Sequence, residues 1–310
     1  MKIDGRSYSS AVMEKAMHCV AREPAFHLAA DSLREVGEIK ISTRHLQTLA
    51  AWVGKELEQQ RDAQVEVYFH QPLPRKKTAP GTPLQLACVS ADGGRVQTRR
   101  EGGPPGAHQP HWRETKNAVF LRMIGGTFSE DPQPSLPTCF KDRRYMKSLL
   151  SGVSEPLDEA TEALTEKSDL ASWRPERLFR TCLSSMCDSD SFGRMMQSEA
   201  DSRGFFRAAR KAYLGDGQAY NWTIQKRHFR GFTPILDLMH ALEHCYEAVR
   251  CVRDEEGRRW ELYQVWAETI WQGRMSSLLA QMRREHLSMR AARLNSPQRS
   301  KSCFRRRINR

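Results

Sequence analysis

Apolar and polar residues alternate with helical spacing over the first 65 residues of the chain. This spacing predicts helices over residues 8–20, 26–36 and 43–60, and Ser42 is well placed to cap the last of them. The apolar stripe of that last helix consists of Leu46, Leu49, Ala50, Val53 and Leu57. We therefore expect a small all-α N-terminal region over residues 1–65.

The polar face of the third predicted helix suggests a partner for this region. Arg44 and Gln47 face away from the apolar stripe, close to the start of the helix. Short helices that end in a polar-faced one suit a helix-turn-helix DNA reader. They suit an ordinary three-helix bundle nearly as well, so both interpretations stay open.

A proline-rich stretch separates this region from the rest of the chain. Residues 66–83 hold too many prolines for a helix or a central strand, which predicts a linker. Beyond it, an apolar run, a Gly-Gly pair and an alternating run predict a β-hairpin over residues 84–100, with Asp92 ending its first strand. Residues 111–123 predict a third strand, so we expect a three-stranded antiparallel meander.

The second half of the chain alternates helices with short strands. We expect helices over residues 140–153, 179–203 and 238–250. Two short strands precede the last of these, and the first ends on Asp216 between glycines. The order strand-Asp, strand, strand, helix, strand-Asp, strand, helix is that of a ribonuclease-H-like α/β core, a mixed sheet flanked by helices. We assign residues 84–282 to this core.

The basic charge lies mostly at the end of the chain. The formal net charge is +12, but residues 283–310 hold ten Lys or Arg against one acid, and the rest carries only +3. A basic balance suits a nucleic-acid partner. A basic tail is also often a solvated, disordered end, and we expect residues 283–310 to be one.

The composition indicates the cellular compartment. No apolar run reaches the ~18 residues that a membrane span needs, and the N-terminus lacks the apolar region of a signal peptide. Eight cysteines without a C-x-x-C pair suggest free thiols in a reducing compartment. A zinc site that uses His240, His244 and Cys245 lacks a visible second pair of ligands. We expect a cytoplasmic protein with no membrane partner.

Two acids stand at the ends of predicted strands that the proposed core makes neighbours. Asp92 and Asp216 would converge there, although Asp216 taken alone suits a turn or helix cap. Converging carboxylates repel, and a divalent cation that prefers oxygen ligands relieves the repulsion. Two such ions can activate an attacking water or 3′-hydroxyl in phosphoryl transfer, with a third carboxylate completing their sites.

Several long motifs in this order resemble those of the DDE-type transposases of bacterial insertion sequences, in particular the ISKra-type family. The resemblance covers roughly residues 30–275. The motifs lie at residues 89–100, 111–116, 136–140, 214–219 with Trp222, and 232–237 with His240. The resemblance implies a DNA transposase that binds the ends of its element, cuts with Mg²⁺ or Mn²⁺ and joins a 3′-hydroxyl to target DNA.

The resemblance also implies roles for individual residues. Asp92 and Asp216 match the first two catalytic and metal-binding carboxylates, and Asp237 with His240 matches a D-x-x-H element beside the active site. From the residues alone, Asp237 is equally a helix cap and His240 an ordinary helix residue. The residues that we expect to contact DNA are Arg44, Gln47, Arg95, Arg99 and Arg100. Such a protein would act as a homo-oligomer on DNA, associated with the nucleoid.

The chain departs from the family near its C-terminus. The family's third acid, a Glu on a helix well beyond the Trp-Gln-Gly segment, has no counterpart here. Glu261, Glu268 and Glu285 are replacements only by elimination, and salt bridges suit them better. We therefore expect a truncated member with impaired or lost activity. The alternatives are a DNA-binding remnant without catalysis and, by fold-level analogy, a metal-dependent nuclease.

Overall fold

The chain folds into two compact units. The computed structural model describes residues 8–72, 84–98, 111–151, 175–253 and 255–294. By their internal contacts these residues divide into Met1–Lys77 and Thr78–Arg310. The division falls within the stretch that was predicted as a linker.

The N-terminal unit is a helical cluster around a small core. Its helices are α1 (Ser10–Arg22), α2 (Phe26–Gly37) and α3 (Thr43–His70). Ser42 caps α3 as predicted, because its hydroxyl accepts a hydrogen bond from the backbone N–H of His45. The buried residues of this core are Ala16, Ala29, Leu33, Ile41 and Leu46. The three predicted helices are therefore confirmed.

Helix α3 is longer than its predicted range. It has 28 residues, whereas α1 has 13 and α2 has 12, so the shorter helices cannot cover its whole length. Leu57, which we expected in the apolar stripe, is 59% exposed for this reason. Residues 66–70 are helical, and the linker assigned to residues 66–83 was wrong over that part.

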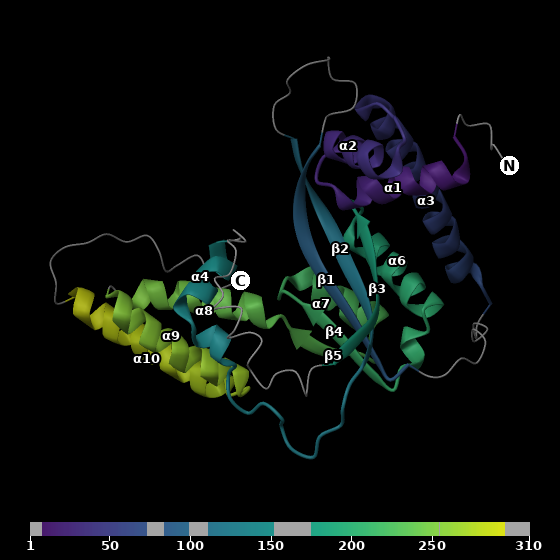
Figure 1. Cartoon of the computed structure of the whole chain (residues 1–310). Helices are drawn as coiled ribbons and strands as arrows, with labels where there is room; N and C mark the ends of the chain where they lie inside the picture. Colours follow the sequence, from purple (N-terminus) through teal and green to yellow (C-terminus); the bar gives the residue numbers. More distant parts are fainter. Residues whose placement is uncertain (1–7, 73–83, 99–110, 152–174, 254, 295–310) are drawn as a thin grey trace. The chain divides into compact units, whose positions relative to one another are not determined.

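The second unit is built on a five-stranded mixed sheet with the order β3-β2-β1-β4-β5 (Figure 1). The strands are β1 (Leu86–Thr98), β2 (His111–Ile124), β3 (Glu176–Ser185), β4 (Arg210–Gly215) and β5 (Thr233–Leu236). The first three pair antiparallel, and β4 pairs parallel with both β1 and β5. The prediction that the first and fourth strands are neighbours is confirmed.

Helices follow the later strands. The α-helices of this unit are α4 (Arg143–Ser151), α6 (Ser189–Ser202), α7 (Ala219–His228), α8 (Leu238–Val252), α9 (Glu256–Trp271) and α10 (Met275–Leu294), and short 3₁₀ helices are η1 (Thr138–Lys141) and η3 (Phe205–Arg207). Along the chain α6 joins β3 to β4, α7 joins β4 to β5, and α8 follows β5 (Figure 1). None of the helices in the described ranges combines the length and apolar character that crossing a membrane requires.

Alternation along the strands buries one face of the sheet. Ala87, Val89 and Ala91 of β1 are at most 2% exposed, and they share a core with Phe192 and Met196 of α6. Each fully buried large side chain contributes about 1.5–3 kcal/mol by leaving water. A one-residue slip of β1 would expose this set, so the core fixes the register that places Asp92.

A second core holds the C-terminal helices together. Met146 of α4, Leu242 of α8, Trp266 of α9 and Leu278 of α10 are all at most 3% exposed within it. Figure 1 shows these four helices grouped side by side. Helix α8 therefore belongs to this helical cluster and also follows directly from the sheet through β5.

The Gly-Gly pair is not a turn, contrary to the predicted hairpin. Gly93 and Gly94 lie inside the continuous strand β1 and pair with Lys116 and Thr115 of β2. The hairpin was assigned because two glycines commonly mark a tight turn. Here side chains of the neighbouring strand lie too close to leave room for a larger residue, since a Cβ at Gly94 would lie 3.0 Å from Thr115 Oγ1.

Two further predictions need correction. The helix expected over residues 179–203 begins only at Ser189, because residues 179–185 belong to β3. This strand lies at the edge of the sheet and is largely exposed, so it lacks the alternation that reveals a strand. The tail expected to be disordered from residue 283 is helical to Leu294, and Glu285 of this part pairs with Arg253 at 2.6 Å.

Candidate metal centre

The sheet brings the middle of β1 next to the end of β4. Ala91 of β1 pairs with Gly215 of β4 in the parallel ladder, so the next residues are Asp92 within β1 and Asp216 directly after β4. Neighbouring strands lie about 4.7–4.9 Å apart, so the residues that follow the last pair start close together. The convergence of Asp92 and Asp216 therefore follows from strand order and register.

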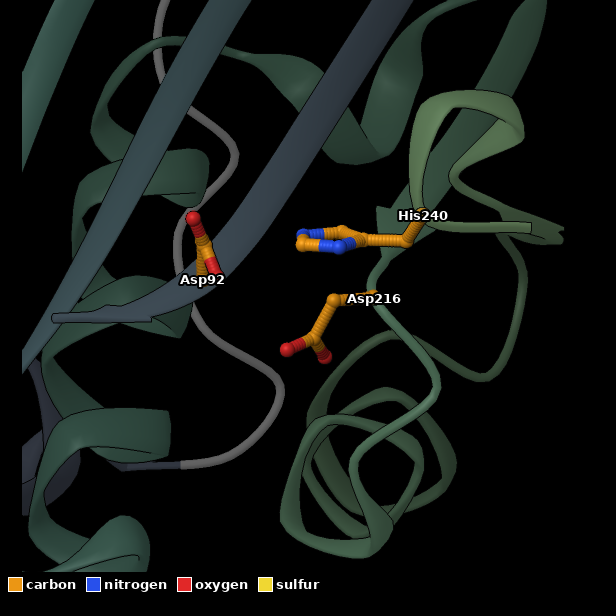
Figure 2. Close-up of side chains that lie close together, drawn as sticks. All are labelled: Asp92, Asp216 and His240. Atoms are coloured by element: carbon orange, nitrogen blue, oxygen red, sulfur yellow. The ribbon is translucent and has the colours of Figure 1, made fainter. Parts of the chain in front are cut away.

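His240 completes a cluster with these two acids. One ligand atom from each of Asp92, Asp216 and His240 lies within 4.8 Å of the others. Figure 2 shows the imidazole extending from the start of α8 toward the two carboxylates. Asp92 is exposed, whereas Asp216 and His240 are partly buried. Asp92 comes from strand β1, Asp216 from the loop after β4 and His240 from helix α8. The cluster is exposed to solvent at Asp92.

Hydrogen bonds hold Asp216 in place. Its Oδ1 accepts from the backbone N–H of Gln218 at 3.0 Å and from Nδ2 of Asn221 at 2.7 Å. Asn221 is fully buried, and its Nδ2 also donates to the carbonyl oxygen of Ala91 at 3.3 Å. A single amide therefore connects the loop after β4 to β1, directly beside Asp92.

The donor set fits a divalent cation. Oδ1 of Asp92 accepts from the N–H of Gly93 at 2.7 Å, and Asp216 uses Oδ1 for its own bonds. Each carboxylate has a second oxygen that can face an ion. Carboxylates suit Mg²⁺ and Mn²⁺, and imidazole is a common ligand of transition metals. Three ligands on an open site leave coordination positions for water or a substrate oxygen.

The carboxylate of Glu243 lies next to His240. Nδ1 of His240 lies 3.5 Å from Oε2 of Glu243 on the same turn of α8. Histidines that bind metals usually give their other ring nitrogen to such a partner, which fixes the ring. We did not predict Glu243 from the sequence, although its spacing of three residues on a helix was the available signal.

Asp237 acts as a helix cap. Its Oδ1 accepts from the backbone N–H of Met239 at 2.8 Å at the start of α8. It is not part of the cluster of Asp92, Asp216 and His240. Asp237 begins the helix, and its backbone N–H donates to the carbonyl oxygen of Gly215, the residue before Asp216, at 2.8 Å. Of the two residues of the D-x-x-H element, His240 is the one whose side chain joins the acids.

The residues expected to contact DNA belong to both units. Arg44 and Gln47 are exposed on α3 of the N-terminal unit. Arg95 is exposed on β1, three residues beyond Asp92. Arg99 and Arg100 lie outside the described residues.

The candidate replacements for a third acid are engaged elsewhere. Glu268 pairs with Lys141 at 2.9 Å and accepts from the backbone N–H of Leu136. Partial burial alone would raise the pKa of Glu268. The hydrogen bonds from Lys141, Leu136 and Gln272, together with the charge of Lys141, outweigh this effect and hold that pKa below its ordinary value. Glu285 pairs with Arg253, and Glu261 is exposed on α9. Among the described residues, the cluster contains two acids.

Two residues near the cluster were not predicted. Tyr220 at the start of α7 has its pKa raised to about 12, chiefly by burial and then by the negative charges of Asp216, Glu114 and Asp92. Glu114 pairs with Arg95 in the β1–β2 ladder, and Arg95 is three residues beyond Asp92. Glu114 was missed because its position depends on the β1–β2 register, which the wrongly predicted hairpin obscured.

Comparison with known proteins identifies no relative of this chain. No family model, no curated protein and no solved structure matches the chain. The case for a function therefore rests on the motifs, on the strand order and on the cluster of Asp92, Asp216 and His240.

Proposed function

We propose that the chain is a DDE-transposase-like protein that carries out divalent-metal-dependent phosphoryl transfer on DNA. The observation that supports this most strongly is the meeting of Asp92, Asp216 and His240 within 4.8 Å. The strand order β3-β2-β1-β4-β5 is compatible with a ribonuclease-H-like core. The formal net charge of +12 suits a nucleic-acid partner.

Each residue of the cluster has a distinct part in the proposal. A bound divalent cation would polarise the phosphodiester and lower the pKa of an attacking water or 3′-hydroxyl. Asp92 and Asp216 would hold it through carboxylate oxygen atoms, and His240 would add a nitrogen ligand. Asn221 would keep Asp216 oriented through the bond at 2.7 Å. The exposed side of Asp92 would admit the DNA backbone.

The experiment measures cleavage and strand joining on DNA that flanks the coding sequence, with Mn²⁺ or Mg²⁺, on denaturing gels. We expect Asp92→Asn and Asp216→Asn each to abolish products, while Glu130→Gln, an exposed acid on a loop, leaves them unchanged. Survival of activity in either Asn variant would remove that residue from the site.

Metal binding gives a second measurement that does not depend on activity. Mn²⁺ should raise the melting temperature of the wild type but not of Asp92→Asn or Asp216→Asn. Without metal, each Asn variant should melt no lower than the wild type, because it relieves repulsion between two carboxylates. A lower melting temperature without metal would indicate a structural role for that acid instead.

A DNA-binding protein without catalysis is the second candidate. It is favoured by the presence of only two acids in the cluster among the described residues, where a two-metal site uses three. In that case the wild type would bind DNA and Mn²⁺ but give no cleavage products at any metal concentration.

A further inference from the structure

A polar pocket adjoins the candidate metal centre. Its volume is about 470 Å³, and it is lined by Gly93, Gly94, Arg95, Glu114 and Gln218. Gly93 directly follows Asp92, and the backbone N–H of Gln218 donates to Asp216. The pocket is thus joined to both acids of the cluster through adjacent backbone, and its size is within the range of ligand sites.

Gly93 keeps the pocket open. A Cβ at Gly93 would lie 3.1 Å from Tyr220 Oη and 3.7 Å from Gln218 Nε2. A Cβ at Gly94 would lie 3.0 Å from Thr115 Oγ1. The contact at Gly93 is tighter than ordinary packing, so a larger residue there would occupy the space that Gln218 and Tyr220 now border. A side chain at Gly94 would instead meet Thr115 and Asn117, which do not line the pocket.

The lining combines a cation, an anion and an amide. Arg95 and Glu114 are cross-strand partners in the β1–β2 ladder, and both are exposed. Gln218 is at the N-cap position of α7 but makes no side-chain capping bond. The negative charge of Glu114 disfavours a phosphate in the pocket. An uncharged ring that carries both hydrogen-bond donors and acceptors matches this lining better.

Nucleobases have this chemistry. Arg donates to guanine acceptors, Glu accepts from the cytosine amino group, and Gln can do both with adenine. We propose that this pocket receives one nucleobase next to the phosphodiester held at Asp92 and Asp216, and so sets a base preference at the cleavage site. This inference depends on the proposed action on DNA.

The experiment uses the full chain and DNA with randomised positions. Binding is measured in Ca²⁺, and bound sequences are compared with the input; cleavage products in Mn²⁺ are sequenced in parallel. We expect the wild type to prefer one base at one position beside the cut. Glu114→Gln and Gln218→Ala should each reduce that preference about five-fold or more. Gln218→Ala keeps the backbone bond to Asp216.

Matched controls are Glu130→Gln and Gln97→Ala, which change the same residue types at exposed positions outside the pocket lining. A uniform loss of binding in the pocket variants, with the base preference intact, would overturn the inference. So would a wild type that binds DNA with no preference near the cut, although the proposed function would survive. A wild type that binds no DNA at all would overturn both.

Discussion

At the scale of single residues, Asn221 is as important to the candidate site as the acids themselves. It is a buried amide that donates both to Asp216 and to the backbone of Ala91. A buried polar group of this kind is costly to leave unpaired, so its partners determine where it can sit. The geometry of the cluster thus depends on a residue that binds no metal.

We expect Asn221→Ala to lower the free energy of unfolding by about 1–3 kcal/mol and to weaken Mn²⁺ binding about ten-fold or more. Urea unfolding and calorimetric titration measure the two effects. Gln225→Ala is the matched control, because Gln225 is also a buried amide and donates to carbonyl oxygens of Phe229 and Phe232. An equal loss of metal affinity in both variants would contradict the special position of Asn221.

The sequence allowed the acids to be predicted better than their surroundings. Asp92 lies within β1 and Asp216 directly follows β4, and the predicted pairing of these two strands was enough to bring the acids together. His240 came from the family resemblance, because a single His on a helix carries no such signal. Glu114 and Gln218 could not be predicted as partners, because the pairing of β1 with β2 places Glu114 and the pairing of β1 with β4 places Gln218.

At the scale of elements, Glu268 connects α9 to the segment around η1. It accepts from the backbone N–H of Leu136 and pairs with Lys141. Its pKa is held below the ordinary value, so the stabilisation it gives is present above the ordinary carboxyl pKa of ~4.3. That stabilisation is lost as the pH falls through the lower folded-state pKa.

We expect Glu268→Gln to lower the free energy of unfolding by about 1–2 kcal/mol at pH 7, because a partly exposed charged pair is screened by water. The difference from the wild type should shrink as the pH is lowered from 7 to below ~4. Denaturant unfolding at both pH values measures this, with the exposed Glu261→Gln on the same helix as control. A difference that grows on acidification would contradict the assignment.

Elements differed in how well their sequence patterns revealed them. Helix α8 has a strong apolar face and an Asp cap, and its predicted range of 238–250 was nearly correct. Strand β3 pairs with β2 along its length but exposes most of its residues, so no alternation marked it. The Gly93-Gly94 pair was wrongly predicted as a turn, because close packing against a neighbour and tight turns both favour glycine.

At the scale of the whole molecule, the basic charge is concentrated at one end of the sequence. Residues 295–310 contain six Lys or Arg and no acid. Deleting them leaves the ion pair between Arg253 and Glu285 of α10 intact. The effect of this segment on DNA binding can therefore be separated from the stability of the helical cluster.

We expect the deletion of residues 295–310 to reduce the slope of log affinity against log salt by up to about five, because six cations are removed. Fluorescence anisotropy with a labelled duplex over a range of KCl concentrations measures the slope. The full-length chain with these six residues changed to Gln should behave like the deletion. An unchanged slope in both would show that the segment makes no phosphate contacts.

The parallel pairing of β1 with β4 also affects how the chain folds. The bond from Asn221 to Ala91 joins residues 130 positions apart, whereas β1 and β2 pair across one short connection. Closing the longer loop costs more chain entropy before contacts compensate, so this pairing should form late. During refolding, the ability to bind Mn²⁺ should then appear only in the slowest phase, after most secondary structure has formed.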